Sequence, residues 1–175
     1  MKNSLLILIL VLTFSSKGQN FTLENYSKKE VYIEMRDGVK LFTAIYAPKN
    51  ATQDYPVLLK RTPYSVAPYG KGQMPKTIMH NPDLVAAGYI FVHQDVRGRW
   101  MSDGLFENTK PPYSWEDKKQ TDEVTDSYDT YEWLVKNLEH FNGNIGQYGN
   151  SYLGFTSLVA SVTGHPNLKA VLAMA

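Results

Sequence analysis

A serine at a predicted strand-to-helix corner is the residue of this sequence with the clearest chemical signature. Residues 148–154 read Tyr-Gly-Asn-Ser-Tyr-Leu-Gly, between a short β-rich run at 145–149 and a helical pattern from Ser151 to about residue 162. A corner this sharp needs small neighbours, and Gly149 lies just upstream of Ser151. It would present the Ser151 hydroxyl outside the sheet, with helix N–H groups directed at an oxyanion. The expected chemistry is nucleophilic attack on a carbonyl.

The glycine spacing around this serine departs from the usual Gly-x-Ser-x-Gly pattern. Leu153 occupies the second position after Ser151, and the glycine follows one residue later as Gly154. A Gly-x-Ser triplet alone is a weak signal. The prediction therefore depends on the corner between strand and helix.

The elements that would position Ser151 alternate between strands and helices. A hairpin is expected at 30–47 around Asp37-Gly38, apolar strands at 56–61, 89–95, 145–149 and 168–174, a turn at 142–144, and helices at 81–87, about 122–138 and 151–162. This alternation implies right-handed βαβ units. The sequence thus predicts an α/β fold in which an antiparallel hairpin leads into a mostly parallel sheet with flanking helices.

Five motifs in this order resemble one family of serine hydrolases, which comprises bacterial cocaine esterases, α-amino-acid ester hydrolases and X-Pro dipeptidyl-peptidase-like enzymes. They lie at 35–41, 61–64, 94–104, 129–134 and the elbow at 148–154, and together they cover residues 30–175. The resemblance implies the α/β-hydrolase fold and hydrolysis of an ester or amide through an acyl-enzyme, with no cofactor. Three stretches look most like the amino-acid ester hydrolase and acylase branch, and an X-Pro dipeptidyl peptidase is the alternative.

The same resemblance implies two oxyanion donors beside the nucleophile Ser151. The phenol O–H of Tyr64, which follows the strand at 56–61, would act together with the backbone N–H of Tyr152. A preorganised donor of this kind lowers the barrier by roughly 3–4 kcal/mol. Without the resemblance, Tyr64 would be interpreted as a tyrosine that packs beside a turn proline.

The base that a nucleophilic serine needs is harder to find. The histidines are His80, His93, His140 and His165. Only His165 follows Ser151, but it lies at the far end of the same predicted helix, roughly 20 Å away at 1.5 Å per residue. His93 could face Ser151 from a neighbouring strand, although a histidine in mid-strand is more often a core residue.

In α/β-hydrolases the acid and the histidine of the triad follow the serine in the chain. Both are therefore expected beyond residue 175, which makes the chain the N-terminal part of a longer enzyme. The apolar strand that ends the sequence agrees with this expectation. The competing hypothesis, from another class, is a catalytically inactive fragment or binding module.

Charged residues in the loop after residue 95 allow two interpretations. Arg97 or Arg99 could bind a substrate carboxylate, or could anchor the loop through an Asp–Arg pair, and anchoring is favoured because arginine forks commonly hold loops. Asp103 and Glu107 suggest a metal loop, but the calcium ligand spacing is missing. No metal is expected.

The composition limits the kinds of molecule that the protein is expected to bind. The chain has 175 residues, of which 43% are hydrophobic and 20% charged, and a formal net charge of +1, which fits one globular domain. So small a charge gives no reason to expect nucleic acid as a partner. The expected partner is a small-molecule ester, amide or short peptide, and a homo-oligomer of the full-length enzyme is left open.

The N-terminus resembles a signal peptide. Lys2 precedes an apolar run at 5–14, and small and polar residues lead to Gln19. The run is shorter than the ~20 residues that cross a bilayer, so residues 1–18 are interpreted as a cleaved leader, with an uncleaved anchor as the alternative. A polar linker at 19–29 and the catalytic part at 30–175 would follow. We expect a secreted or periplasmic protein that is not held in a membrane after cleavage and, lacking cysteine, has no disulfide.

Overall fold

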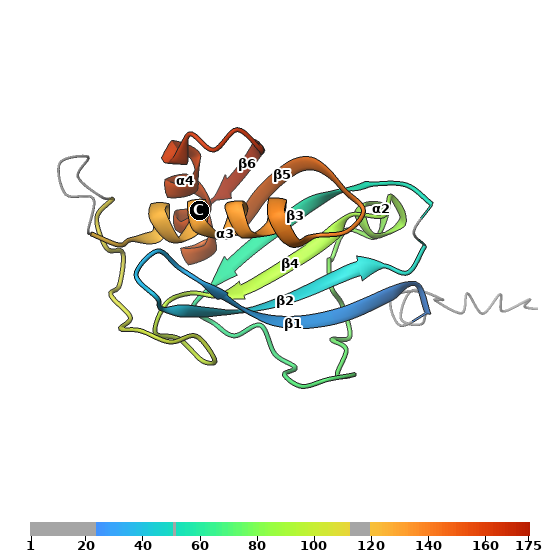
Figure 1. The fold of residues 1–175 in the computed structure, drawn as a ribbon, viewed down its shortest axis with the longest axis horizontal. Helices are drawn as coiled ribbons and strands as arrows, with labels where there is room; N and C mark the ends of the chain where they lie inside the picture. Colours follow the sequence, from blue (N-terminus) through green and yellow to red (C-terminus); the bar gives the residue numbers. More distant parts are fainter. Residues whose placement is uncertain (1–23, 51, 113–119) are drawn as a thin grey trace, which may run out of the picture.

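The fold is a single mixed β-sheet with helices on both faces (Figure 1). The computed structural model describes residues 24–50, 52–112 and 120–175. The elements in chain order are β1 (Tyr26–Glu34), β2 (Lys40–Pro48), β3 (Tyr55–Thr62), α2 (Pro82–Ala86), β4 (Ile90–Asp95), α3 (Glu123–Asn137), β5 (Phe141–Asn150), α4 (Tyr152–Ala160), the short 3-10 helix η1 (Ser161–Thr163) and β6 (Leu168–Met174).

The strand order across the sheet is β1-β2-β4-β3-β5-β6. The β1–β2 hairpin joins β4 in antiparallel fashion, whereas β4, β3, β5 and β6 run parallel to one another. The α/β-hydrolase prediction of a hairpin ahead of a parallel sheet is therefore confirmed. Parallel strands bring their carboxyl ends to one edge, where α/β folds place ligand sites.

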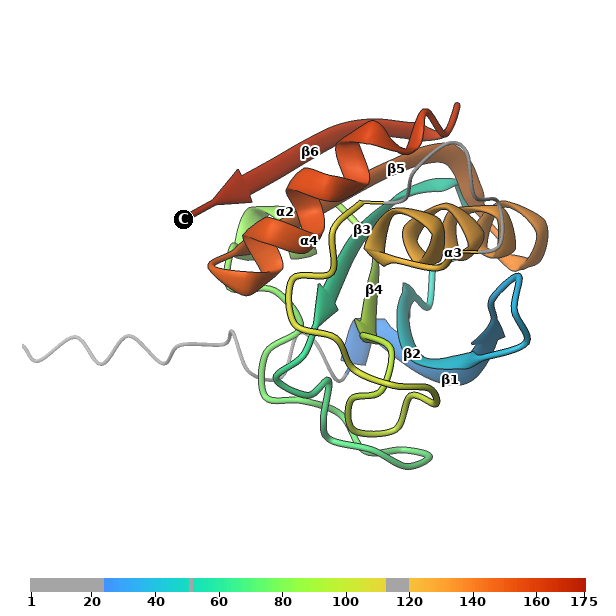
Figure 2. The ribbon, with the colours of Figure 1, turned by 90° about the vertical axis from the view of Figure 1, so that its left-hand side faces the viewer.

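Side chains alternate between the two faces of the sheet, and each face carries a hydrophobic core. Helices α3 and α4 cover one face, and α2 lies on the other (Figure 2). On the first face Val57 and Leu59 of β3 pack with Tyr131 and Leu134 of α3. On the second face Phe91 of β4 packs against residues of β2, α2 and the loop before α2. The central strands are thus buried on both sides, as in parallel sheets generally.

Strand β1 begins earlier than the sequence indicated. Residues 26–29, which were expected to belong to a polar linker, are the first residues of β1 and pair with β2. The Tyr26 ring is buried, and its hydroxyl donates to the backbone oxygens of Val85 and Tyr89, each at 3.1 Å. The pairing with β2 and the buried Tyr26 ring hold this polar segment in the sheet. The predicted leader at 1–18 lies outside the described residues.

The turn predicted at 142–144 is wrong, because these residues lie inside β5. Tyr55 of β3 pairs with Phe141, but Val57 already pairs with Ile145, so extra β5 residues bulge out of the ladder. Gly143 has φ +86° there, and Asn167 donates to its carbonyl oxygen at 2.8 Å. A glycine and two asparagines therefore form a bulge, which local composition does not distinguish from a turn.

Capping residues mark the ends of α2 and the start of α3. Asn81 caps α2, and Gly88 follows it with φ +84°. The Asp122 side chain accepts from the backbone N–H groups of Val124 and Thr125 and so caps α3.

Among the helices in the described part of the chain, none has the length and apolar character required to span a membrane.

Candidate active site

Ser151 lies at the corner where β5 ends and α4 begins. Its backbone has φ 58° and ψ −126°, a conformation that L-residues adopt only under strain, and its side chain is exposed. A Cβ at Gly149 would lie 2.2 Å from the Leu153 carbonyl oxygen, so only glycine fits there. The sequence prediction of an exposed serine on a sharp corner, with a small residue before it, is confirmed.

Backbone hydrogen bonds fix this corner from both sides. The Ser151 N–H donates to the carbonyl of Met174 at the end of β6, at 3.0 Å. The Ser151 carbonyl accepts from Phe155 N–H at 3.0 Å and so closes the first turn of α4. Tyr152 is the first residue of α4, so its N–H has no acceptor within the helix. A negatively charged oxygen near Ser151 would meet this N–H and the positive end of the helix dipole.

Tyr64 lies at the same edge of the sheet as Ser151. It follows the carboxyl end of β3, which pairs in parallel with β5. Its ring is 61% exposed and meets the Tyr152 ring edge-on, with 6.4 Å between the ring centroids. The chain therefore brings together the three residues singled out from the sequence: Ser151, Tyr64 and Tyr152. Their roles in a reaction stay predictions.

Aromatic rings continue from Tyr152 along one side of the corner. Phe106 and Phe155 lie 6.1 Å and 5.6 Å from the Tyr152 ring centroid. The Tyr152 hydroxyl accepts from the backbone N–H of Thr109 at 3.2 Å. Burial raises the pKa of this phenol. The loop before α3 thus packs directly against the first residue of α4.

Asp95, at the end of β4, organises the loop that contains Tyr64. One carboxylate oxygen accepts from the Val66 N–H at 3.0 Å, and the other accepts from the Tyr69 hydroxyl at 2.8 Å. Asp95 is fully buried, and this desolvation raises its pKa even though the hydrogen bonds act in the opposite direction. Sequence reasoning missed this role. A polar residue that ends a buried parallel strand was the available signal.

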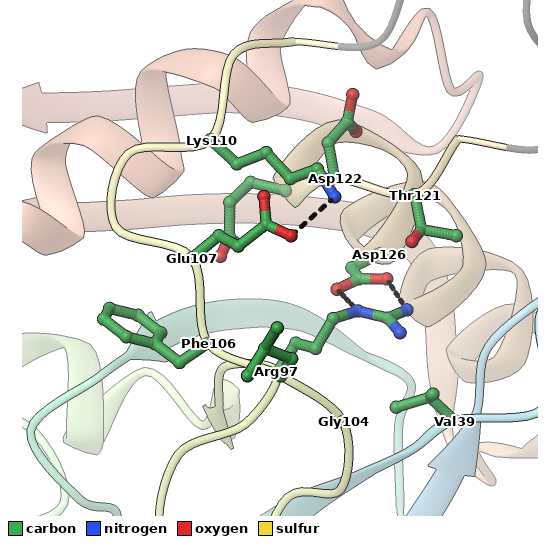
Figure 3. A pocket seen from close by; sticks show the side chains of 11 residues that line it. Val39, Arg97, Gly104, Phe106, Glu107, Lys110, Thr121, Asp122 and Asp126 are labelled. Carbon is green, nitrogen blue, oxygen red and sulfur yellow. Dashed lines mark hydrogen bonds and ion pairs between the residues drawn. The ribbon is translucent and has the colours of Figure 1, made fainter.

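Arg97 anchors the following loop through Asp–Arg pairs, the favoured interpretation, although its acidic partners lie outside the loop. Arg97 donates to both carboxylate oxygens of Asp126 on α3 and to Asp37 in the hairpin turn. Figure 3 shows Arg97 and Asp126 directed at each other. Both line a cavity of about 170 Å³. Hydrogen bonds with these carboxylates raise the pKa of Arg97 despite its partial burial. Its donors are therefore engaged by the protein itself.

Sequence reasoning also missed a buried ion pair under this loop. Arg61 of β3 is completely buried and donates to the Glu123 side chain, to Ser127 Oγ at 3.0 Å and to Gln94 Oε1 at 2.7 Å. Burial raises the pKa of Glu123, and the charge of Arg61 only partly offsets this. The pair connects β3 and β4 to the first turn of α3, just below the corner.

None of the histidines meets Ser151. His165 accepts from the Asn167 N–H at Nδ1, so its Nε2–H donates to Glu132 Oε1 at 3.2 Å. Its ring packs on Tyr128 and Tyr131, which agrees with the exclusion made from helix length. His93 is buried in the core, as expected for a residue in mid-strand. His80 is exposed, and His140 faces Asp54 at the other end of the sheet. In the described part of the chain no histidine hydrogen-bonds to Ser151, and no cluster of side chains suits a metal ion.

Comparison with known proteins connects this geometry to hydrolases. Residues 37–175 match the model of the X-Pro dipeptidyl-peptidase (S15) family. The cocaine esterase of Rhodococcus sp. (strain MB1 Bresler) is 35% identical over 148 residues, which is 84% of this chain and 23% of that esterase. The chain thus spans about a quarter of the length of this relative.

Solved structures of two similar proteins show the same fold. An aminopeptidase from a marine sediment Thaumarchaeota archaeon matches 94% of this chain and 27% of its own with a TM-score of 0.72 and 37% identity. An α-amino acid ester hydrolase matches 93% of this chain and 28% of its own with a TM-score of 0.74 and 36% identity. The family match over residues 37–175 includes the corner at Ser151.

Proposed function

Because the chain belongs to the X-Pro dipeptidyl-peptidase (S15) family, we propose that it carries the nucleophile end of a serine hydrolase that cleaves an ester or amide bond. The observation that carries the proposal is the exposed Ser151 on a strained corner, at the start of a helix. A structural serine gains nothing from this conformation, whereas a nucleophile gains access to the substrate and adjacent N–H donors.

The reaction would proceed by acyl transfer. Ser151 Oγ bonds to the substrate carbonyl carbon while a general base takes the hydroxyl proton, and the carbonyl π electrons move to oxygen. The phenol O–H of Tyr64 and the N–H of Tyr152 donate to this oxyanion. The protonated base then gives this proton to the leaving oxygen or nitrogen, the carbonyl re-forms as the bond to the leaving group breaks, and an alcohol or amine departs. The acyl-enzyme that remains is hydrolysed by water in the same way.

We propose that the base comes from outside the described residues, because no histidine there reaches Ser151. The chain spans about a quarter of the length of its cocaine esterase relative, which agrees with a base outside the described residues. The competing proposal is that the chain on its own is inactive and acts at most as a binding module. The two differ in whether Ser151 becomes reactive.

For the substrate we propose an α-amino-acid ester or an acyl amide. Support comes from the 36% identity to an α-amino acid ester hydrolase. An X-Pro dipeptide is the second candidate, since the matching family model is described as X-Pro dipeptidyl-peptidase. Parallel assays with phenylglycine methyl ester and with an Xaa-Pro p-nitroanilide distinguish the two. We further propose export to the periplasm or outside the cell, through a leader at residues 1–18.

A fluorophosphonate probe tests the proposed function, because it labels only an activated serine. Labelling should map to Ser151 and disappear in Ser151→Ala. Ser161→Ala is the matched control, since this exposed serine lies at the opposite end of α4 and should not affect labelling. We expect the 175-residue chain to label weakly and a version extended to the length of the relatives to label stoichiometrically. Labelling elsewhere, or undiminished labelling of Ser151→Ala, would refute the proposal.

A further inference from the structure

The position of Tyr64 is determined through its backbone more than through its side chain. The phenol is largely exposed, and its ring meets the Tyr152 ring edge-on. The Tyr64 N–H, by contrast, donates to Thr62 Oγ1 at 3.0 Å. The next residue, Ser65, has φ 90°, a conformation that a serine adopts only when its surroundings impose it.

The peptide that leads into Tyr64 is held by two side chains from another loop. The carbonyl oxygen of Pro63 accepts from Trp100 Nε1 at 2.8 Å and from Arg99 Nε at 3.1 Å. A carbonyl has two lone pairs, so both bonds can form together, and one donor is charged. The plane of the Pro63–Tyr64 peptide is therefore fixed by side chains that lie outside the loop after β3.

Both donors are themselves held in place. The Arg99 guanidinium lies 5.1 Å from the centroid of the Phe106 ring, in a cation–π contact. The loop containing Trp100 is tied to β4 by Ser102 Oγ, which donates to the Asp95 carbonyl at 2.7 Å. Trp100 adopts φ 53°, and its side chain is 59% exposed. Burial therefore does not explain this indole, whereas its hydrogen bond to Pro63 does.

We propose that Trp100 and Arg99 are positioning residues, which hold the Tyr64 phenol at the oxyanion site through the Pro63 carbonyl. The inference rests on the proposed function, since it assumes that Tyr64 donates to an oxyanion beside Ser151. A donor contributes to catalysis only when it is already aimed at the developing charge, and an error of 1 Å lowers rates by about 100-fold. An exposed tyrosine that directly precedes a strained residue needs such an external support.

A double-mutant cycle tests this coupling. Trp100→Phe removes the indole N–H and keeps a ring, and it is made both in the wild-type protein and in Tyr64→Phe. Hydrolysis of p-nitrophenyl acetate is measured in the form of the protein whose Ser151 reacts with the fluorophosphonate. We expect Trp100→Phe to lower kcat about tenfold and to change KM less than about twofold. In the Tyr64→Phe background it should change kcat less than about twofold.

Other outcomes would refute the positioning role. An equal fall of kcat in both backgrounds, or a rise of KM alone, would mean that the indole contacts the substrate directly. An unchanged kcat would mean that the loop is only anchored. Arg99→Met should reproduce the effect of Trp100→Phe, and Leu105→Ala, at an exposed position of the same loop, should leave kcat unchanged.

Hydrogen exchange gives a readout that does not need activity. In the 175-residue chain, the amide of Tyr64 should exchange about tenfold faster in Trp100→Phe than in the wild type, while amides of α3 keep their rates. Unchanged exchange at Tyr64 would refute the positioning role even if Ser151 is the nucleophile. Conversely, failure of Ser151 to label would refute the proposed function and leave the exchange result unaffected.

Discussion

Gly154 in α4 packs directly on the backbone of Met174 at the end of β6. A Cβ at Gly154 would lie 2.1 Å from the Met174 carbonyl oxygen, which also accepts the N–H of Ser151. This contact explains why the glycine follows Ser151 at the third position instead of the usual second. The glycine is required where the helix touches the next strand, whereas Leu153 is only partly buried.

Gly154→Ala should therefore separate α4 from β6. The added methyl meets backbone, which cannot rotate away, so we expect the free energy of unfolding to fall by at least about 1 kcal/mol despite the better helix propensity of alanine. Urea denaturation measures this, and fluorophosphonate labelling of Ser151 should fall as well. Gly146→Ala is the control, because its methyl would meet the flexible end of Leu58 at 3.0 Å, while the nearest backbone atoms lie at an ordinary contact distance of 3.8 Å. Equal losses in the two variants would contradict the explanation.

Tyr64→Phe tests the oxyanion donor itself. Removal of one donor typically lowers kcat by about 100- to 1000-fold, and KM should change little because the bond forms in the transition state. Steady-state kinetics with p-nitrophenyl acetate measure both constants. Tyr32→Phe, which removes a phenol O–H from a half-exposed position in the hairpin, should leave both unchanged. A kcat for Tyr64→Phe near the wild-type value would rule out the donor role.

The corner at Ser151 could be predicted from the sequence because its determinants are local. An apolar strand, a glycine, a serine and a helical pattern follow one another within a few residues, and steric limits on the backbone then produce a sharp turn that exposes the serine. The closeness of Tyr64 to Ser151 could not be predicted from local sequence. Its prediction requires the strand order, in which β3 and β5 are neighbours although α2, β4 and α3 lie between them in the chain. The family resemblance supplied that order, whereas residue spacing did not.

The polar contacts beneath the site could not be predicted in this way. Arg61 and Glu123 are 62 positions apart, and their pairing depends on how α3 crosses β3. One signal was available for Arg61, because strand alternation places it on the same face as Val57 and Leu59, which are core residues. The Pro63–Trp100 contact left no such signal, since both residues lie in loops whose paths depend on their mutual contacts.

Arg61→Met should be strongly destabilising. It leaves Glu123 buried without its cation, and breaking a buried pair costs about 3–5 kcal/mol. The pKa of Glu123 is already raised by burial, so without Arg61 its ionisation is harder still, and the loss of stability should be larger at pH 8 than at pH 5.

Urea denaturation at the two pH values measures the loss, and Arg61→Met combined with Glu123→Gln should recover part of it. Lys136→Met is the control, because the pair that Lys136 forms with Glu132 is exposed and contributes little. No recovery in the double variant would mean that the remaining donors of Arg61 carry the stabilisation.

His93 should make the protein sensitive to acid. Burial, together with the charge of Lys60, holds the pKa of His93 well below its usual range, whereas in the unfolded chain it titrates near 6.5. Below about pH 6.5 the unfolded state therefore binds one proton more than the folded state, and stability falls by about 1.4 kcal/mol per pH unit until the folded pKa is reached.

His93→Phe tests this dependence. The imidazole of His93 lies 5.2 Å from the Tyr46 ring, between centroids, and phenylalanine keeps a ring there but removes the proton. The variant should flatten the dependence of stability on pH between pH 7 and pH 5. The slope is measured by urea denaturation at several pH values. His80→Gln, at an exposed position, should keep the wild-type slope, and an unchanged slope in His93→Phe would assign the acid sensitivity to other groups.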